Sequence, residues 1–534
     1  DPVFPATNFE IRPETPGSNG ALRALLEQVR GHYYWFWLGD ETFRCGTSFG
    51  AIFPLYYRMA EGRAWLSSSA FFLAGQTDPG TPDRRYLLER LLFNYAFFDS
   101  TWWENIRLLP AHRCIQATSA GIRVEKYLNI GDYFGSGQRH SRNDLMDLAA
   151  AFGAESRLFL PDAPFAISFT GGFDGRTLVA AARAAGRSDF FTYSFGMPGE
   201  SDVTFPAEQA GSIGIRYQPI LLDEQYVERH ACKAALAFMR ETEYFGNFGS
   251  PHYQYAAGVL AEKTNYILTG NFGSELFRAM HQPGVMMSEA LIRVFSSPDA
   301  SWKDFLREAA GAGAAAFFQN ELDALIADLE RYLEEYNDGD PNRRFYRFVL
   351  EEIFRKYFGP ELVMQSGYLR NRTPYLSLPF FQSLNETVWA GVHARLFEKQ
   401  KNKRMKGQLF YAAFLRRTDP QLYRLPTNKG YSPADVLETW RLPLLLARVA
   451  RQKFFRKETG DSNAVEAYLS RYRHALVDVG QAAADPVLNR SGIVLALQNT
   501  PLDELEKTIH AYTLAAGWTA ATPFVNQSEP IQIR

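Results

Sequence analysis

Residues 163–182 read APFAISFTGGFDGRTLVAAA, and this order predicts an apolar strand, a glycine-rich turn and an alanine-rich helix. Gly171 and Gly172 have no side chains, so the backbone of the turn can approach a ligand closely. The start of the following helix directs free N–H groups at an anion, which is the arrangement of a phosphate-binding loop. Asp174, inside the turn, is placed to hold a divalent cation on the same phosphates.

A glycine pair between a strand and a helix is also a common way to pack an α/β unit, so the turn alone leaves both interpretations open. The segment at residues 170–175 resembles the SGGxDS pyrophosphate loop of the asparagine synthetase family, with Thr170 and Gly175 in place of the serines. Members of that family activate a carboxylate with ATP as an acyl-adenylate and transfer it to an amine. The resemblance implies an ATP site formed by Thr170, Gly171, Gly172, Phe173, Asp174, Gly175 and Arg176, with Asp174 also holding Mg²⁺.

Length and composition set wide bounds on the protein. A chain of 534 residues exceeds one ordinary core, and usual domain sizes predict about two to four units. Hydrophobic residues make up 46% and charged residues 22%, which is typical of a soluble globular protein. A net charge of −2 gives no general attraction for nucleic acid, so we expect no nucleic-acid partner.

The cysteine pattern predicts a reducing compartment. Cys45, Cys114 and Cys232 lie far apart and form no CxxC pair, which argues against a disulfide scaffold or a cysteine-rich metal site. We find neither a signal-peptide pattern nor a transmembrane run in the sequence. We therefore expect a cytoplasmic protein without an integral membrane segment.

The first part of the chain is rich in aromatic and β-branched residues in short runs, which predicts a β-rich domain. Strands are expected at residues 32–38, 43–47 and 64–68, and a helix at 86–98. Gly39-Asp40 and Glu61-Gly62 are candidate hairpin turns.

This first part also resembles the later portion of the glutaminase domain of the same family. The likeness rests on GAIFPLYY at residues 50–57 and on TWWENIRLLPAH at residues 101–112. In glutamine-hydrolysing members an N-terminal Cys attacks the amide, whereas here the first residue is Asp1 and the first cysteine, Cys45, lies inside a predicted strand. We expect Cys45 to be a small buried residue and the domain, residues 1–135, to be a degenerate one that releases no ammonia.

Strands and helices alternate from about residue 140 to residue 280, which predicts a doubly wound parallel sheet with its ligand at the carboxyl ends of the strands. From about residue 290 the apolar spacing predicts helices at 301–318, 321–336, 343–358, 378–397 and 405–417. The alternating part has expected strands at 164–169, 190–195, 216–221 and 266–269, and helices at 176–186 and 204–213.

Further segments carry the family resemblance in the same order along the chain. Residues 193–202 resemble the segment that holds the nucleotide base, which implies contacts from Ser194 and Gly196. Residues 267–277 (ILTGNFGSELF) resemble VLTGEGADELF, which implies metal and pyrophosphate contacts from Gly270, Ser274 and Glu275. Ser274 stands where that segment has a carboxylate, so a magnesium ion would lose one charged ligand.

Two later segments extend the resemblance into the helical part. Residues 370–376 (RNRTPYL) resemble the segment ExRxPFL, with Arg372 and Pro374 matching. Residues 425–433 (LPTNKGYSP) resemble the late loop whose lysine stabilises negative charge on the reacting carbonyl and pyrophosphate, which implies that role for Lys429.

Together these patterns predict an α/β protein with two parts. A degenerate β-rich, glutaminase-like domain at residues 1–135 precedes a doubly wound ATP pyrophosphatase domain with a large helical C-terminal part at 136–534. We expect an ATP-dependent, AMP-forming ligase that joins a carboxylate to an amine, with Asp174 and Lys429 as catalytic residues. Members of the family without the glutaminase cysteine include β-lactam synthetases and lasso peptide cyclases, which implies a peptide macrolactam made from a ribosomal precursor peptide together with its processing protein.

Two alternatives remain open. The protein could amidate a small molecule or a sugar acid with ammonia or glutamine. It could also be a catalytically silent relative kept as a binding partner in a biosynthetic complex, because Gly175, Asn271, Ser274 and Ser377 all lack polar groups that the family motifs carry.

Overall fold

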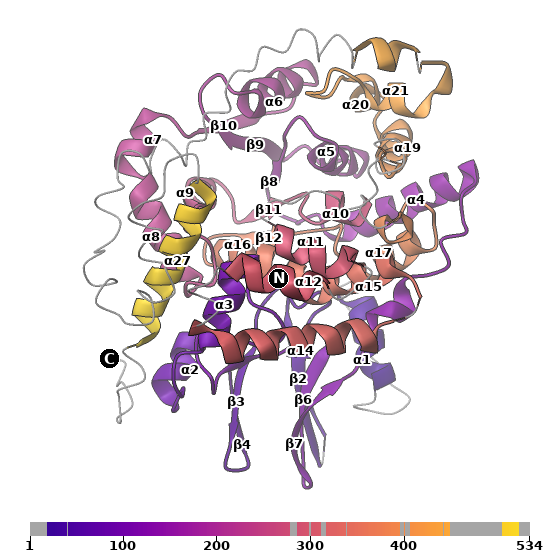
Figure 1. The fold of residues 1–534 in the computed structure, drawn as a ribbon. Coiled ribbons are helices and arrows are strands. Elements are labelled where there is room, and N and C mark those ends of the chain that lie inside the picture. The colour runs from indigo at the N-terminus through magenta and orange to yellow at the C-terminus, as the bar shows by residue number, and fades with distance from the viewer. Residues whose placement is uncertain are drawn as a thin grey trace.

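The computed structural model combines antiparallel sheets, one parallel sheet and a large set of helices (Figure 1). The two antiparallel sheets belong to the N-terminal region, and the parallel sheet lies in the middle of the molecule. The structure describes residues 19–39, 41–277, 286–297, 301–310, 317–337, 339–395, 400, 406–441, 443–448 and 505–522.

The N-terminal sheets are antiparallel throughout, in the orders β1-β2-β6-β7 and β4-β3-β5. The turn between β3 and β4 has positive φ at both Glu61 and Gly62, as a two-residue hairpin requires, so the predicted turn is confirmed. The strands are β1 (Tyr34–Leu38), β2 (Thr42–Thr47), β3 (Tyr56–Ala60), β4 (Arg63–Ser67), β5 (Arg107–Leu108), β6 (Arg113–Thr118) and β7 (Gly121–Lys126).

Short helices accompany these sheets. The predicted helix at 86–98 ends early, because Asn94 takes the left-handed conformation and caps α3 by donating its N–H to the carbonyl of Arg90. The helices are α1 (Asn19–Gln28), α2 (Ala70–Gln76), α3 (Arg84–Phe93) and η1 (Ile130–Tyr133).

The central sheet is parallel, in the order β10-β9-β8-β11-β12. Its middle strand β8 is the apolar strand expected before the glycine turn. In Figure 1, α5 and α19 lie on one side of this sheet and α8 and α9 on the other. The strands are β8 (Phe165–Ser168), β9 (Phe190–Gly196), β10 (Tyr217–Leu221), β11 (Tyr266–Leu268) and β12 (Arg370–Arg372), and the associated helices are α4 (Arg142–Leu158), α5 (Asp174–Ala184), α6 (Ser201–Ser212), α7 (Glu224–Arg229), α8 (Ala231–Glu241) and α9 (Pro251–Ala261).

The remainder is helical, as predicted, with one clear correction. The helix expected at 378–397 ends at Asn385, where the hydroxyl of Thr387 donates to the carbonyl of Leu384 at 2.7 Å and replaces a helical partner. The elements are α10 (Gly273–Phe277), α11 (Glu289–Ser296), α12 (Ser301–Ala310), α14 (Gln319–Glu335), α15 (Pro341–Phe348), η2 (Val349–Phe358), α16 (Gly359–Ser366), α17 (Leu378–Asn385), η3 (Gly391–His393), α19 (Gln408–Thr418), α20 (Pro420–Arg424), α21 (Pro433–Leu437), η4 (Thr439–Arg441) and α27 (Leu505–Ala521).

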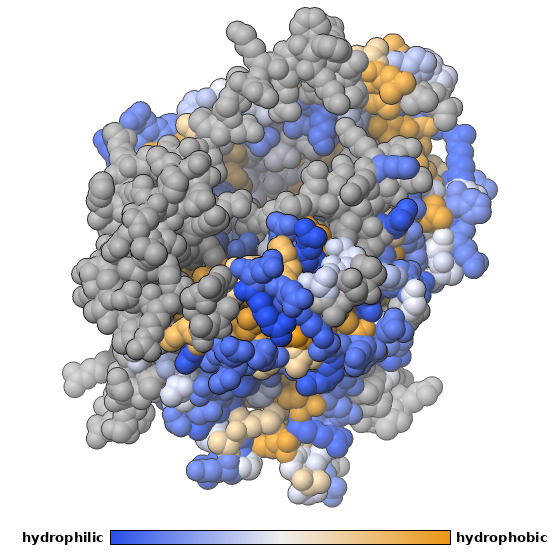
Figure 2. Space-filling model, viewed as in Figure 1, coloured by the Kyte–Doolittle hydropathy of each residue, from blue (hydrophilic) through white to orange (hydrophobic). Residues whose placement is uncertain are grey.

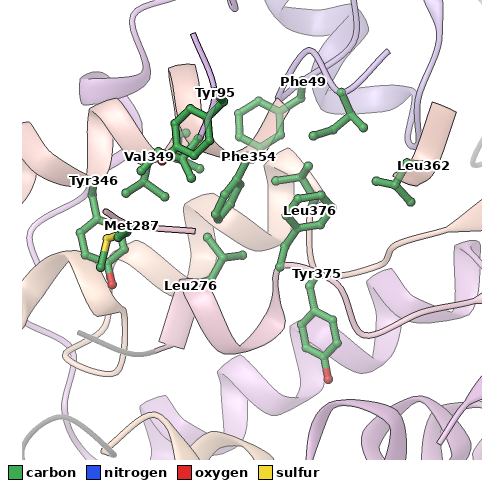
Figure 3. Packing of buried hydrophobic residues seen from close by; sticks show 14 of the residues in the cluster. Phe49, Tyr95, Leu276, Met287, Tyr346, Val349, Phe354, Leu362, Tyr375 and Leu376 are labelled. Carbon is green, nitrogen blue, oxygen red and sulfur yellow. The ribbon is translucent and has the colours of Figure 1, made fainter. Parts of the chain in front are cut away.

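One hydrophobic core joins the N-terminal region to the later helices. Phe49 and Tyr95 of the N-terminal region belong to the same buried cluster as Leu276 of α10 and Val349 and Phe354 of η2 (Figure 3). The core therefore crosses the boundary predicted after residue 135, and that boundary stays a prediction.

The outer face of the helical layer is polar. Helix α14 buries Leu322, Leu325, Ile326 and Leu329 at helical spacing and turns its charged residues outward. Figure 2 shows hydrophilic residues over much of this face, in the region where Figure 1 places α14.

Truncating the shared core should destabilise the whole protein. Phe354 is fully buried, with its ring 5.0 Å from that of Phe272. We expect Phe354→Ala to lower the free energy of unfolding by about 3–5 kcal/mol, seen as a lower midpoint of urea unfolding. The matched control is Phe36→Ala, whose ring is 62% exposed and whose loss should leave the midpoint almost unchanged. Equal shifts in the two variants would contradict the packing described.

Candidate functional site

The glycine turn leads directly from β8 into α5, so the helix begins at the carboxyl end of the central strand. The turn is compact, because the N–H of Gly172 donates to the hydroxyl of Thr170 at 3.4 Å. A Cβ at Gly175 would lie 2.2 Å from the carbonyl oxygen of Ser168, so only glycine fits this first turn of the helix. The result is a half-buried helix N-terminus at the carboxyl ends of the strands, where ligands of parallel sheets bind.

Hydroxyl groups from distant segments surround Asp174, the first residue of α5. Ser274 of α10 donates to one carboxylate oxygen at 2.9 Å, and Tyr411 of α19 donates to the other. Tyr375 donates to the backbone carbonyl of Asp174 at 3.2 Å. A Cβ at Gly270 would lie 2.6 Å from the Cβ of Asp174, so that glycine gives the carboxylate room.

These contacts bear on the predicted magnesium site. A protein-held Mg²⁺ needs oxygen ligands of negative charge, and the family pattern supplies two carboxylates. Here Ser274 brings a hydroxyl that donates to Asp174. In the part of the chain that the structure describes, no group of three or more His, Cys, Asp or Glu residues could hold a metal ion. With a hydroxyl at Ser274, Asp174 is left as the one carboxylate at the two positions that the family pattern uses, so these two residues do not fit a two-carboxylate magnesium site.

The loop that carries Lys429, residues 425–433 (the lysine loop), lies against the glycine turn at residues 170–175. The N–H of Asn428 donates to the carbonyl of Gly171 at 3.3 Å, and a Cβ at Gly171 would lie 2.5 Å from that of Asn428. The loop closes on itself through the N–H of Thr427, which donates to the carbonyl of Tyr431 at 2.7 Å. The exposed Lys429, next in the chain to Asn428, is thereby brought beside the turn.

Arg176 holds this loop in place. The residue is fully buried, and its guanidinium donates to the carbonyls of Leu425 and Pro426 at 2.6 and 2.8 Å and to the side chain of Gln209 at 2.6 Å. Burial lowers the pKa of Arg176 to about 10. These contacts indicate a positioning role for Arg176, through the lysine loop, in place of the phosphate contact expected from the sequence.

The other predicted residues lie around the same strand ends. Ser194 of β9 is buried, and its hydroxyl bonds to the hydroxyl of Tyr217 at 2.7 Å. Gly196 ends β9, the neighbour of β8 in the sheet. Glu275 of α10 is half-buried, and its backbone carbonyl accepts a hydrogen bond from Tyr346 at 3.3 Å. The glycine turn, Asp174, Gly270, Ser274 and the lysine loop thus form one cluster, while Ser194 uses its hydroxyl internally.

The sequence did not reveal a second carboxyl group at this sheet edge. Glu361 of α16 lines a cavity of about 150 Å³ together with Ser168 at the end of β8 and Thr269 and Asn271 just after β11. Burial raises the pKa of Glu361 from 4.5 to about 8. In the sequence Glu361 follows Pro360 at a helix start, where an acidic residue is ordinary, so no local signal marks it.

A chain of hydrogen bonds ends at this carboxyl group. The hydroxyl of Thr269 donates to Asn371 at 3.0 Å, the amide of Asn371 donates to Gln365, and the amide of Gln365 donates to Glu361 at 2.9 Å. Every donor points the same way, so the chain fixes the orientation of Glu361 at the edge of the cavity.

The sequence predicts that Cys45 is a small buried residue of a domain that releases no ammonia. The residue is fully buried, and burial raises the pKa of its thiol to about 12, which suppresses the reactive thiolate. The predicted burial of Cys45 is confirmed, and its lack of a nucleophilic role stays a prediction. Cys45, Cys114 and Cys232 are all free cysteines.

Comparison with known proteins agrees with this site. Residues 154–354 match the family model described as asparagine synthase, which supports an ATP-dependent carbon–nitrogen ligase in general. The matched segment contains the glycine turn, Asp174 and Ser274, and it ends before Glu361 and Lys429. A search of curated proteins found no match. Among the described residues, no helix has the length and apolar character needed to span a membrane.

The buried carboxyl group should make stability depend on pH. Glu361 binds a proton in the folded chain up to about pH 8 but loses it near 4.5 when unfolded, so the free energy of unfolding should fall between these values. The slope is at most about 1.4 kcal/mol per pH unit. We expect Glu361→Gln to flatten this fall in urea unfolding measured from pH 5 to pH 8.

The control for that experiment is Glu262→Gln, which changes an exposed glutamate at the end of α9. It should keep the pH dependence of the wild-type protein. An unchanged slope in Glu361→Gln would show that Glu361 is ionised in the folded protein.

Proposed function

We propose that this protein is an ATP-dependent, AMP-forming ligase that adenylates a carboxylate and joins it to an amine. The observation that carries the proposal is the contact between the glycine turn and the lysine loop, which brings Lys429 beside the start of α5. Phosphate recognition by a helix N-terminus and charge stabilisation by an ammonium group are the two requirements of adenylation.

In the first half-reaction, backbone N–H groups at the start of α5 bind phosphate oxygens of ATP. The substrate carboxylate attacks the α-phosphorus, and pyrophosphate leaves. Lys429 stabilises the negative charge that develops on the pyrophosphate, and Arg176 keeps the lysine loop in position.

In the second half-reaction, the amine attacks the acyl carbon, AMP leaves and the nitrogen loses a proton. Glu361 is the residue we propose to accept this proton, because its cavity opens at the ends of β8 and β11. Burial raises its pKa to about 8, so the carboxylate that forms as the pH rises toward 8 is a stronger base than an ordinary glutamate. Lys429 again stabilises the charge on the reacting carbonyl.

A peptide macrolactam is the preferred product, formed from a ribosomal precursor peptide with the help of its processing protein. The support is the family resemblance together with the free thiols of Cys45 and Cys114 in the N-terminal sheets, which are buried and whose pKa values are raised by that burial, as is unfavourable for a nucleophile that releases ammonia. A reaction that consumes ATP also fits the cytoplasmic location expected from the cysteines.

Variants should separate the two half-reactions. We expect Lys429→Ala and Asp174→Ala to lower ATP–pyrophosphate exchange about 100-fold or more. Glu361→Gln should lower amide formation about 100-fold while leaving exchange within about threefold of wild type. Exchange is measured with candidate peptide acids, and amide formation with either a peptide amine or ammonium.

The control is Lys233→Ala, because Lys233 is an exposed lysine on α8 that belongs to no part of the site. Product from the peptide amine but not from ammonium supports the macrolactam. The reverse result supports amidation of a small molecule or sugar acid, and equal loss of both half-reactions in Glu361→Gln refutes its role as the base.

A catalytically silent binding partner remains the alternative. It is favoured by Ser274, whose hydroxyl donates a hydrogen bond to Asp174 where the family pattern has a second carboxylate. That reading predicts no exchange in the wild-type protein and a gain of Mg·ATP binding in Ser274→Asp. Exchange in the wild-type protein would exclude it.

A further inference from the structure

A cavity of about 730 Å³, away from the glycine turn, lies between the N-terminal sheets and the helical layer. One wall comes from β5, β6 and β7, and the other from α14 and η2. Figure 1 shows α14 crossing above the strands of the N-terminal sheets. The volume of the cavity falls in the range of small-molecule binding sites.

Glu351 of η2 lines this cavity and is only 8% exposed. Its carboxylate has no hydrogen bond or ion pair with any residue that the structure describes. Its neighbour Glu352 is instead bonded to Lys356 and to the N–H of Phe98. Burial raises the pKa of Glu351 to about 7, although Lys126, Arg347 and Arg113 act in the opposite direction. A buried carboxylate without a partner is unfavourable unless a ligand supplies one.

The cations near Glu351 are mostly engaged elsewhere. Arg347 donates to Asn129 and lies 4.2 Å above the ring of Tyr336, and Lys126 donates to the hydroxyl of Tyr336 at 3.0 Å. Arg113, on the opposite wall, differs from both. No hydrogen bond or ion pair joins its guanidinium to the described part of the protein, so Glu351 and Arg113 place unpaired charges of opposite sign on the two walls.

Polar and aromatic groups complete the lining. The hydroxyl of Tyr332 is buried and has no partner among the described residues. Rings of Tyr57, Phe98, Tyr332 and Tyr336 line the cavity, and such rings attract an ammonium group. Glu351 projects from a π-helix, a geometry that is rare and often found at functional sites.

We propose that this cavity binds a zwitterion of short-peptide size, whose ammonium group pairs with Glu351 and whose carboxylate pairs with Arg113. The two charges of the ligand then match the two unpaired charges of opposite walls, and the hydroxyl of Tyr332 gains an acceptor or donor. The proposal does not depend on adenylation, because it concerns binding at a different place in the fold.

Calorimetry with the full chain, without ATP, tests the proposal at about pH 7.5, above the raised pKa of Glu351 and below the pKa of the peptide's amino group. The probes are trialanine, its N-acetyl form and its C-terminal amide. We expect trialanine to bind, and each blocked form to bind at least about tenfold more weakly. Acetylation should have little further effect on the affinity of Glu351→Gln, because the substitution and the acetyl group remove the same contact. Amidation should likewise have little further effect on the affinity of Arg113→Gln.

Glu104→Gln is the matched control, since Glu104 lines the same cavity but is exposed, and its affinity for trialanine should equal that of wild type. Tyr332→Phe keeps the ring, removes the unpartnered hydroxyl and should weaken binding about threefold or more. No binding of trialanine up to about 10 mM would overturn the proposal. Affinity that is unchanged by acetylation, or unchanged in Glu351→Gln, would overturn it as well.

Discussion

The site depends on the hydrogen bonds that three hydroxyl groups donate to Asp174. Ser274, Tyr411 and Tyr375 reach this single residue from α10, from α19 and from the segment after β12. The start of α5 is thus fixed by residues 100 to 237 positions away in the chain. Losing one of these donors leaves a polar group unpaired in a packed region, at about 1–3 kcal/mol each. The helical C-terminal part is therefore required for the shape of the glycine turn.

Local patterns predicted much of the fold but only part of the site. The apolar run of β8 and the glycines after it define a strand, a turn and a helix within about 20 residues, so the sequence carries their signal. Tyr411 and Glu361 gave no such signal, because an aromatic residue on an apolar helix face and an acidic residue at a helix start are both ordinary. Strand β12 was missed for a similar reason, since three residues reading Arg-Asn-Arg show no alternation.

Arg176 shows how position in sequence can mislead about role. It follows the glycine turn, where a cation next to phosphate is expected, but its planar guanidinium matches a set of carbonyl oxygens in the lysine loop. Burial makes the charge costly, and the carbonyls with the amide of Gln209 compensate for lost water. A pKa of about 10 keeps Arg176 charged at neutral pH, so the loop that carries Lys429 is held by a permanent cation.

The two carboxyl groups of the site differ because their surroundings differ. Asp174 accepts two hydroxyl donors at a half-buried helix start, whereas Glu361 is enclosed and burial raises its pKa to about 8. In the proposed mechanism these different environments give the two carboxyl groups different tasks, with Glu361 as the proton acceptor. Since Ser274 removes a negative charge beside Asp174, less positive charge is needed to offset phosphate there. In the proposed reaction the N-terminus of α5 and Lys429 supply that positive charge, in agreement with the contact between the lysine loop and the turn.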